Sequence, residues 1–216
     1  MNWIRLHITT EGQTEQRFVR TTLKRHLNQY HKMVNAIPVL TSRDNKNGVE
    51  YRGGFRKHNA YPTVRKDIIN SIKINDKPDC RFSTMFDLYA LPNDFPGWIE
   101  SSKKDDPYEK VKIIEDAFFK DISDPRFIPY IQLHEFEALI FSDPHKMAVQ
   151  FLDHKDQIDK LSAICDEVND KNPERINDGK ETAPSKRILS IFPNYKKTSD
   201  GPAVVESIGM KTLKRS

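Results

Sequence analysis

The sequence predicts an α/β protein in which a parallel sheet is flanked by helices and followed by a helical annex. Up to about residue 144, short apolar runs of strand length alternate with segments whose apolar residues recur at helical spacing. Such alternation is typical of a parallel sheet with helices on both faces. Beyond Pro144 the strand signals stop. We therefore predict an α/β domain over residues 1–144 and a helical annex over residues 145–216 that packs on it.

Each expected element has its own signal along the chain. Four apolar runs predict strands, which we expect to pair in parallel, near residues 3–9, 36–40, 82–87 and 127–132. Apolar residues at helical spacing predict helices at 14–31, 63–74 and 108–120, and the stretch HEFEALIF begins another. Residues 41–62 are polar and contain glycines. We expect them to form a long loop that is mobile without substrate.

Composition and charge exclude several classes of protein. Charged residues make up 31% of the chain, yet 12 Phe, 7 Tyr and 2 Trp supply more aromatic surface than a disordered segment carries. Cys80 and Cys165 lie far apart with no Cys or His at metal spacing, which argues against a zinc site or a disulfide framework. No window approaches the roughly 18 apolar residues of a membrane span, and the N-terminus lacks the apolar core of a signal peptide. These features favour a soluble protein of the reducing cytosol with no membrane partner. The net charge of +4 fits a polyanionic partner without requiring one.

Acidic residues fall where the strands are expected to end. Glu11 follows the first strand, Asp87 ends the third, and Glu135 and Glu137 follow the fourth. Because ligands of parallel α/β sheets bind at the carboxyl ends of the strands, we expect these carboxylates to converge. Their mutual repulsion would be relieved by a hard cation, so the pattern predicts a Mg²⁺ or Mn²⁺ site. Glu135 and Glu137 are two positions apart in an expected helix, so we expect only one of them to face the site.

Several motifs resemble a known family. TTEGQTEQRF after a strand and the strand end TMFDLY resemble a Toprim domain, the metal-binding α/β module of topoisomerases, primases and overcoming-lysogenization-defect nucleases. More closely, EGQTEQRF, TMFDLYALPNDFPG, YIQLHEFEALIF and APSKRI, within residues 9–187, resemble the bacterial Toprim-like family catalogued as domain of unknown function 4276. The resemblance implies nuclease chemistry with Glu11 as the catalytic or metal-linked glutamate and Asp87 as the first acid of the aspartate motif. It also implies an ABC-type ATPase partner, encoded separately, and a role in bacterial anti-phage defence. No GxxxxGK[ST] motif occurs, so the chain has no P-loop of its own.

One position departs from the Toprim pattern. A Toprim motif carries aspartates at two alternate positions, and here Tyr89 occupies the second. A neutral phenol is a poor Mg²⁺ ligand. Asp94 in the following loop, or Glu137, could take over as the metal ligand that Tyr89 does not provide. Alternatively, the site holds a single metal. The choice between one and two metals stays open.

Further candidates have a functional and an ordinary interpretation. Glu15 is either a catalytic acid or a charge that favours a helix N-terminus. Lys186 is a candidate for neutralising charge on a phosphoryl group, and His134 is either a general base or a structural residue. Basic residues that could contact a nucleic-acid backbone, or simply be solvated, are Arg43, Arg52, Arg56, Lys57 and Arg187.

These observations predict a magnesium-dependent, Toprim-like nuclease that acts on DNA or RNA. Two other functions stay open. One is a non-catalytic nucleic-acid-binding or partner-binding subunit on a decayed Toprim fold, which Tyr89 favours. The other is a different metal-dependent phosphotransferase, such as a nucleotide hydrolase. The sequence does not distinguish DNA from RNA, nor a monomer from a homo-oligomer.

Overall fold

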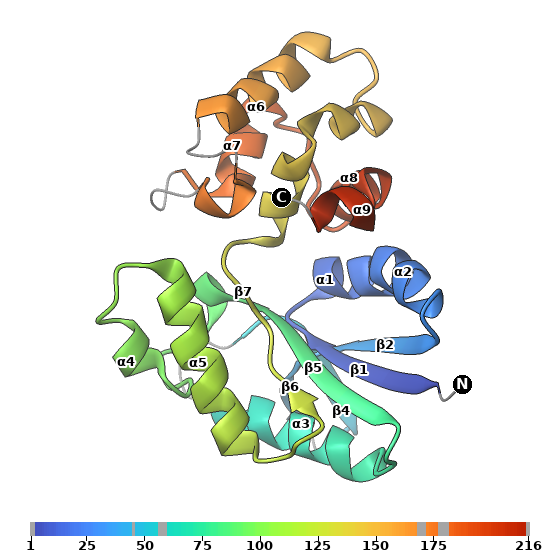
Figure 1. Ribbon diagram of the computed structural model, residues 1–216, viewed down its shortest axis with the longest axis vertical. Helices are drawn as coiled ribbons and strands as arrows, with labels where there is room; N and C mark the ends of the chain where they lie inside the picture. The colour runs from blue at the N-terminus through green and yellow to red at the C-terminus, as the bar shows by residue number, and fades with distance from the viewer. Residues whose placement is uncertain (1–2, 45, 56–59, 168–171, 177–181, 215–216) are drawn as a thin grey trace.

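A parallel sheet forms the centre of the molecule. The computed structural model describes residues 3–44, 46–55, 60–167, 172–176 and 182–214. The strands are β1 (Ile4–Thr10), β2 (Lys32–Pro38), β5 (Cys80–Asp87), β6 (Phe127–Ile128) and β7 (Ile131–Gln132). They are arranged in the order β2-β1-β5-β6, with β7 also pairing with β5, and every pairing is parallel (Figure 1). The predicted parallel sheet is therefore confirmed.

The bounds of the strands differ from the expected runs in places. β2 begins at Lys32, before the run expected at 36–40, and β5 begins at Cys80 but ends at Asp87, where the sequence predicted its end. Leu88–Ala90 then form a short 3₁₀ helix, η2. The fourth strand is divided into β6 and β7 around Pro129. Proline has no N–H to donate to a strand ladder, which explains the interruption.

Helices cover both faces of this sheet. One face carries the continuous helical segment formed by α1 (Gln13–Phe18), the π-helical turn η1 (Val19–Leu23) and α2 (Lys24–Asn28). The other face carries α3 (Tyr61–Ile74), α5 (Pro107–Ile122) and, at the start of α5, the short helix α4 (Trp98–Ser101). Strand alternation divides the core accordingly: Met85 packs with the first group, while Phe82 and Phe86 pack with the second.

Short helices of the C-terminal region form a second body above the carboxyl ends of the strands (Figure 1). They are the 3₁₀ helices η3 (Phe136–Ser142), η4 (Pro144–Val149) and η6 (Pro173–Arg175), and the α-helices α6 (Lys155–Glu167), α7 (Pro184–Ile191), α8 (Asp200–Ile208) and α9 (Met210–Leu213). Helix α8 packs against α1. The rings of Phe18 and Phe136 meet edge to face at 5.7 Å within one buried cluster that also includes Val204. The apolar core of the sheet therefore continues into these helices. Within the described residues, no helix is both long enough and apolar enough to cross a membrane.

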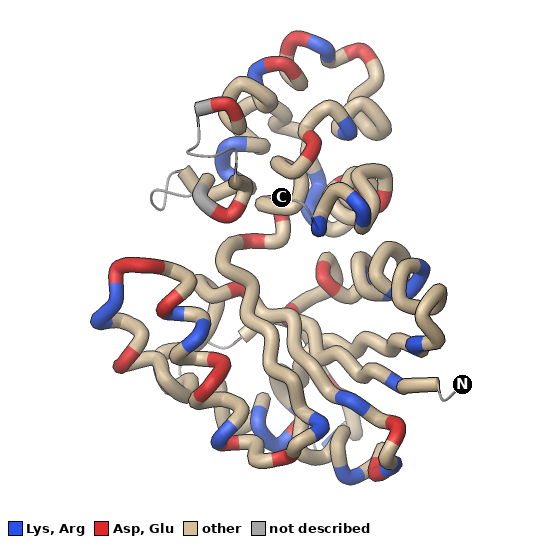
Figure 2. Tube along the Cα trace, viewed as in Figure 1, with Lys and Arg blue, Asp and Glu red and all other residues tan. Residues whose placement is uncertain are grey.

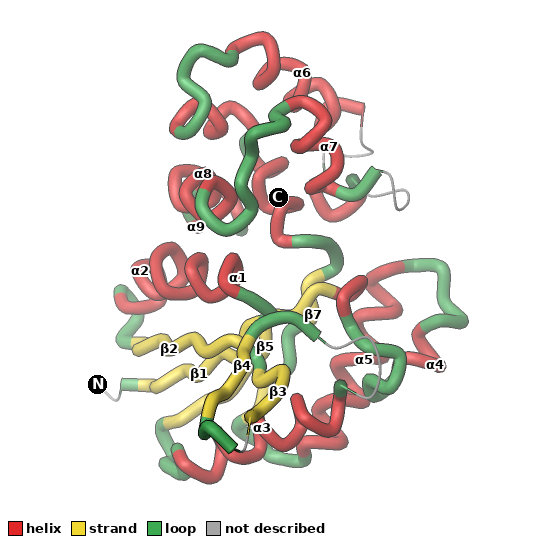
Figure 3. The backbone as a smooth tube through the Cα atoms, turned by 180° about the vertical axis from the view of Figure 1, so that it is seen from behind, coloured by secondary structure: helices red, strands yellow, loops and turns green. Residues whose placement is uncertain are grey.

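The expected loop at 41–62 is wrong over most of its described length. Strands β3 (Leu40–Asp44) and β4 (Val49–Arg52) pair in an antiparallel hairpin whose turn includes Gly48 at φ +66°. Figure 3 shows this hairpin from behind, beside α3. At its base the Gly54 N–H donates to the Glu11 carbonyl at 2.8 Å. Polar side chains can form a two-stranded ribbon when they find partners, which composition alone does not reveal. Mobility of this segment without substrate stays a prediction.

Candidate active site: a pocket of carboxylates

Among the described residues, five carboxylates and one lysine line a hollow at the carboxyl edge of the sheet. We call it the acid pocket, and its volume is about 350 Å³. Its lining residues are Glu11, Gly12, Thr14, Glu15, Gly54, Asp87, Tyr89, Ala90, Glu135, Phe136, Glu137 and Lys197. Acidic positions at the start of α1 and in the segment after β7 are visible where the two bodies meet (Figure 2). The convergence of the strand-end acids is therefore as the sequence predicts.

Glu11 and Asp87 are held together by the backbone of adjacent strands. β1 and β5 pair in a register that places Thr10 opposite Met85, so each acid lies near the end of its strand. The Glu11 N–H donates to the Met85 carbonyl at 3.0 Å, and the Asp87 N–H donates to Glu11 Oε2 at 3.1 Å. One carboxylate oxygen of Glu11 thus fixes the backbone beneath the second acid.

Glu15 is placed by the first turn of α1. Its Oε2 atom accepts a hydrogen bond from the Gly12 N–H at 2.8 Å, and the residue is 7% exposed. A side chain at Gly12 would place its Cβ 3.3 Å from this oxygen, which is a tight contact. The glycine after Glu11 therefore makes room for the second glutamate. Glu15 stabilises the helix start and also contributes charge to the acid pocket.

Both Glu135 and Glu137 face the acid pocket, which corrects the expectation that only one would. Glu135 precedes η3 and has an extended conformation (φ −55°, ψ 153°), so helical spacing does not separate the two residues. The Glu135 Oε2 atom accepts from the Ser185 N–H at 3.0 Å. Glu137 is 2% exposed and lies in the first turn of η3.

Lys197 is the functional candidate that the sequence did not indicate. Its Nζ atom lies 3.6 Å from Glu135 Oε1 and 3.7 Å from Glu137 Oε2. The hydroxyl of Tyr195 in the same loop approaches Glu137 Oε1 at 3.5 Å. The stretch NYKKTS before α8 has no periodicity, and only the fold brings it to the strand ends. The basic pair at 196–197 is its one local signal.

The acids of this pocket resist losing their protons. Burial raises the pKa of Glu11 to about 7, aided by the charges of Glu15 and Glu135 and opposed by the Asp87 N–H and Lys197. Burial likewise raises the pKa of Glu137 to about 7, against the influence of Lys197. The pKa of Asp87 is raised well above its ordinary range, first by burial and then by the charges of Glu11 and Glu15. One lysine does not balance the five carboxylates at neutral pH.

The donor set of the acid pocket fits a hard divalent cation. Within the described residues, no three acidic, histidine or cysteine side chains already stand close enough together to hold a metal ion. Carboxylate oxygens are nevertheless the ligands that Mg²⁺ and Mn²⁺ prefer. The Oδ1 atom of Asp87 is buried and has no hydrogen-bond partner in the described part of the chain. Glu11, Asp87 and Glu137 are the residues that would hold the cation.

Two predicted site residues lie elsewhere. Asp94 is not among the residues that line the acid pocket; its Oδ2 atom accepts from the Tyr61 N–H at 3.2 Å, at the start of α3. Lys186 does not line the acid pocket either. The positively charged side chain among the described lining residues is that of Lys197. Lys186 lies in the first turn of α7, next to Ser185, whose N–H holds Glu135.

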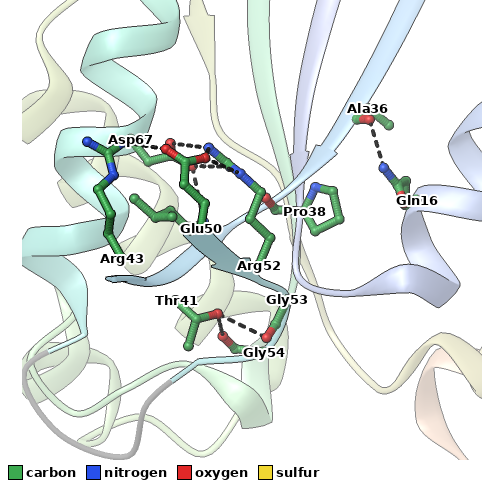
Figure 4. Close-up of polar contacts among 11 residues, drawn as sticks. Gln16, Ala36, Pro38, Thr41, Arg43, Glu50, Arg52, Gly53, Gly54 and Asp67 are labelled. Carbon is green, nitrogen blue, oxygen red and sulfur yellow. Dashed lines mark hydrogen bonds and ion pairs between the residues drawn. The ribbon is translucent and has the colours of Figure 1, made fainter. Parts of the chain in front are cut away.

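The predicted nucleic-acid contacts of the hairpin are engaged within the protein. Arg52 bonds to Asp67 at 3.0 Å and to Glu50 at 2.9 Å, and Arg43 pairs with Glu50 (Figure 4). These pairs attach the hairpin to α3 and its two strands to each other. Arg56 and Lys57 lie outside the described residues. In α7, the Arg187 guanidinium donates to the Thr182 carbonyl at 2.8 Å.

His134 directly precedes Glu135, and its ring bonds to the backbone of another segment. Its Nε2 atom bonds to the Glu174 carbonyl, which means that this nitrogen carries the hydrogen. Burial lowers the pKa of His134, which favours the neutral ring. Tyr89, which takes the place of the second Toprim aspartate, is 56% exposed and stacks on His134 at 5.7 Å between ring centres.

Comparison with known proteins gives a family and one structural likeness. The model of the family described as Domain of unknown function (DUF4276) matches residues 10–216. Among solved structures, the chain is similar to the C-terminal region of the Xanthomonas campestris pv. campestris OLD protein, at 14% identity and a TM-score of 0.39, over 98% of this chain and 89% of that one. At this level the likeness carries no argument. No curated protein matches the chain.

Proposed function

We propose that this chain, which belongs to the DUF4276 family, is a metal-dependent nuclease that cleaves phosphodiester bonds of DNA or RNA. The observation that carries the proposal is the acid pocket. Carboxylates from the ends of β1, β5 and β7 and from α1 share one hollow, and burial and repulsion raise the pKa values of several of them. Clusters of acids with perturbed pKa values at the carboxyl edge of an α/β sheet are typical of functional sites.

The proposed chemistry divides among the residues by their geometry. Bound Mg²⁺ or Mn²⁺ would polarise the phosphate and lower the pKa of an attacking water. Glu11 and Asp87, joined through the Asp87 N–H, provide a rigid pair of carboxylates. Glu137 would complete the set of carboxylates that holds the cation. Lys197 would offset the negative charge that develops on the phosphate.

The resemblance to Toprim-like proteins extends the proposal to partners. On that basis we propose that the chain is the effector subunit of a bacterial anti-phage defence system and works with an ABC-type ATPase. Assembly as a homo-oligomer is compatible with this role. The support here is the resemblance of the motifs, whereas the support for metal-dependent chemistry is the acid pocket itself.

A second candidate is a catalytically decayed subunit that binds nucleic acid or a protein partner. Tyr89 favours it, because a phenol stands where a Toprim domain has a second aspartate. Metal affinity separates the two functions. A decayed site should not bind Mg²⁺ or Mn²⁺ at millimolar concentration, whereas the nuclease should.

The test is cleavage of labelled single-stranded and double-stranded DNA and RNA with Mg²⁺, Mn²⁺ or EDTA. It is run with and without the ATPase, and free nucleotides serve as alternative substrates. Metal-dependent cleavage that disappears in Glu11→Gln and Asp87→Asn would support the nuclease. Hydrolysis of nucleotides alone would point to a nucleotide hydrolase, and metal binding by calorimetry without any reaction would refute both activities.

A further inference from the structure

A second hollow adjoins the acid pocket across Tyr89. We call it the aromatic pocket; its volume is about 510 Å³. Its lining residues are Leu88, Tyr89, Trp98, Ser101, Ser102, Asp105, Asp106, Pro107, Tyr108, Lys110, His134 and Glu174. Tyr89 lines both pockets, and His134 directly precedes Glu135 of the acid pocket. A nucleic acid with a phosphate in the acid pocket therefore has the adjacent part of the nucleotide within reach of the aromatic pocket.

Flat rings dominate the wall of the aromatic pocket. Tyr89 and His134 stack with an interplanar angle of 11°. Tyr89 is 56% exposed, so a large part of its ring lies at the surface of the pocket. Trp98 and Tyr108 add aromatic surface from α4 and the start of α5. Every nucleobase has a π-face, so exposed rings of this kind bind bases with little sequence preference.

The charges of the aromatic pocket disfavour a phosphate. Among the lining residues that the structure describes, Asp105, Asp106 and Glu174 face one cation, Lys110. The Tyr108 hydroxyl donates to Glu174 at 2.7 Å and fixes that carboxylate at the rim. Carboxylates only accept hydrogen bonds, and they pair well with the amino groups of bases. The ligand that suits this wall is uncharged, flat and carries N–H donors.

We propose that the aromatic pocket holds an unpaired nucleobase next to the phosphate in the acid pocket, which makes single-stranded or locally unpaired nucleic acid the substrate class. This inference rests on the proposed function and specifies its substrate. In a duplex each base is stacked and paired, so it reaches such a pocket only after it leaves the stack. Tyr89 would then stack on the base, at the position where a Toprim domain has its second aspartate.

The test compares binding of a labelled single-stranded oligonucleotide and its duplex by fluorescence anisotropy. Ca²⁺, which also takes oxygen ligands, replaces Mg²⁺ so that binding is measured without cleavage. We expect Tyr89→Ala to weaken single-strand binding by about 5- to 100-fold, the effect of losing one stacked base, and Tyr89→Phe to restore it. Tyr30→Ala is the matched control, because Tyr30 is 55% exposed and lines neither pocket; it should bind like the wild type.

An abasic scan of the oligonucleotide tests the same inference, first on the wild-type protein and then on Tyr89→Ala. One abasic position should weaken binding as much as Tyr89→Ala does, and the two changes together should weaken it no further. Equal affinity of wild type and Tyr89→Ala, preference for the duplex, or no binding of single strands would each overturn the inference. Cleavage is scored separately. Tyr89-dependent binding without cleavage would refute the nuclease and keep the base pocket, and cleavage with Tyr89-independent binding would do the reverse.

Discussion

Replacement of Glu11 by Gln should make the protein more stable above neutral pH while abolishing its activity. The pKa of Glu11 is about 7 in the folded protein against an ordinary value of 4.5. The folded state therefore holds a proton between these values that the unfolded state has lost, so stability falls as pH rises through this window. Below about pH 4.5 both states are protonated and the penalty is absent. The glutamine of the variant has no proton to lose, and its amide oxygen can still accept from the Asp87 N–H.

The size of this effect follows from the shift. A rise of the pKa from 4.5 to about 7 corresponds to at most about 3.4 kcal/mol in the free energy of unfolding. Glu11 is half-buried and shares its repulsion with Glu15 and Glu135, so we expect about 1 to 3 kcal/mol. For a chain of this length, each kcal/mol shifts the melting temperature by about 2 to 4 °C.

The assay is a set of melting curves at pH values from about 4.5 to about 8.5. This range covers both the ordinary pKa of a glutamate and the raised pKa of Glu11. The wild type should lose stability across the window relative to Glu11→Gln, and Glu100→Gln, which changes an exposed acid on α4, should follow the wild type. At pH 8, Mg²⁺ at 100 times its Kd should stabilise the wild type by about 2.7 kcal/mol and the variant much less. Parallel curves for wild type and Glu11→Gln would refute the reasoning about the acid pocket.

Further variants test the other members of the site. Asp87→Asn should weaken Mg²⁺ binding in calorimetry and lower the cleavage rate by about 10²- to 10³-fold; unchanged affinity would remove Asp87 from the metal site. Lys197→Met should move the pH dependence of cleavage upward, because Lys197 lowers the pKa values of several acids, whereas Lys186→Met should leave the profile in place. Arg52→Met should lower stability by about 1 to 2 kcal/mol in a denaturant titration; weaker nucleic-acid binding at normal stability would instead restore its predicted role. Tyr89→Phe should cleave at nearly the wild-type rate, and a large loss would mean that the hydroxyl itself takes part.

The sheet and its line of acids could be predicted because both depend on local pattern. Apolar runs of strand length indicated β1 and β5, and the rule that parallel strands end at one edge placed Glu11 and Asp87 side by side. The β3–β4 hairpin could not be predicted in the same way. Its residues are polar, and its stability comes from partners distant in sequence, such as Asp67 for Arg52.

The position of Lys197 in the acid pocket depends on packing between segments that are distant in sequence. Lys197 reaches Glu135 and Glu137 only because α8 packs against α1 and so carries the preceding loop back to the sheet. Sequence periodicity specifies which face of a helix is apolar but not which helix it will meet. The sequence therefore indicated Lys186 as the basic candidate, whereas the lysine among the described residues that line the acid pocket is Lys197.

The cost of the acid pocket is itself an argument about its purpose. Glu11 lies at the end of β1, where its side chain fixes the Asp87 N–H, but a neutral glutamine could make the same hydrogen bond. The negative charge adds nothing to that contact, and burial, together with repulsion from Glu15 and Glu135, makes it unfavourable for folding at neutral pH. Proteins commonly break the rules of stability at functional sites. A carboxylate here is therefore best explained by a positive charge beyond the one that Lys197 supplies among the described residues, and the melting curves with and without Mg²⁺ ask whether that charge is a metal.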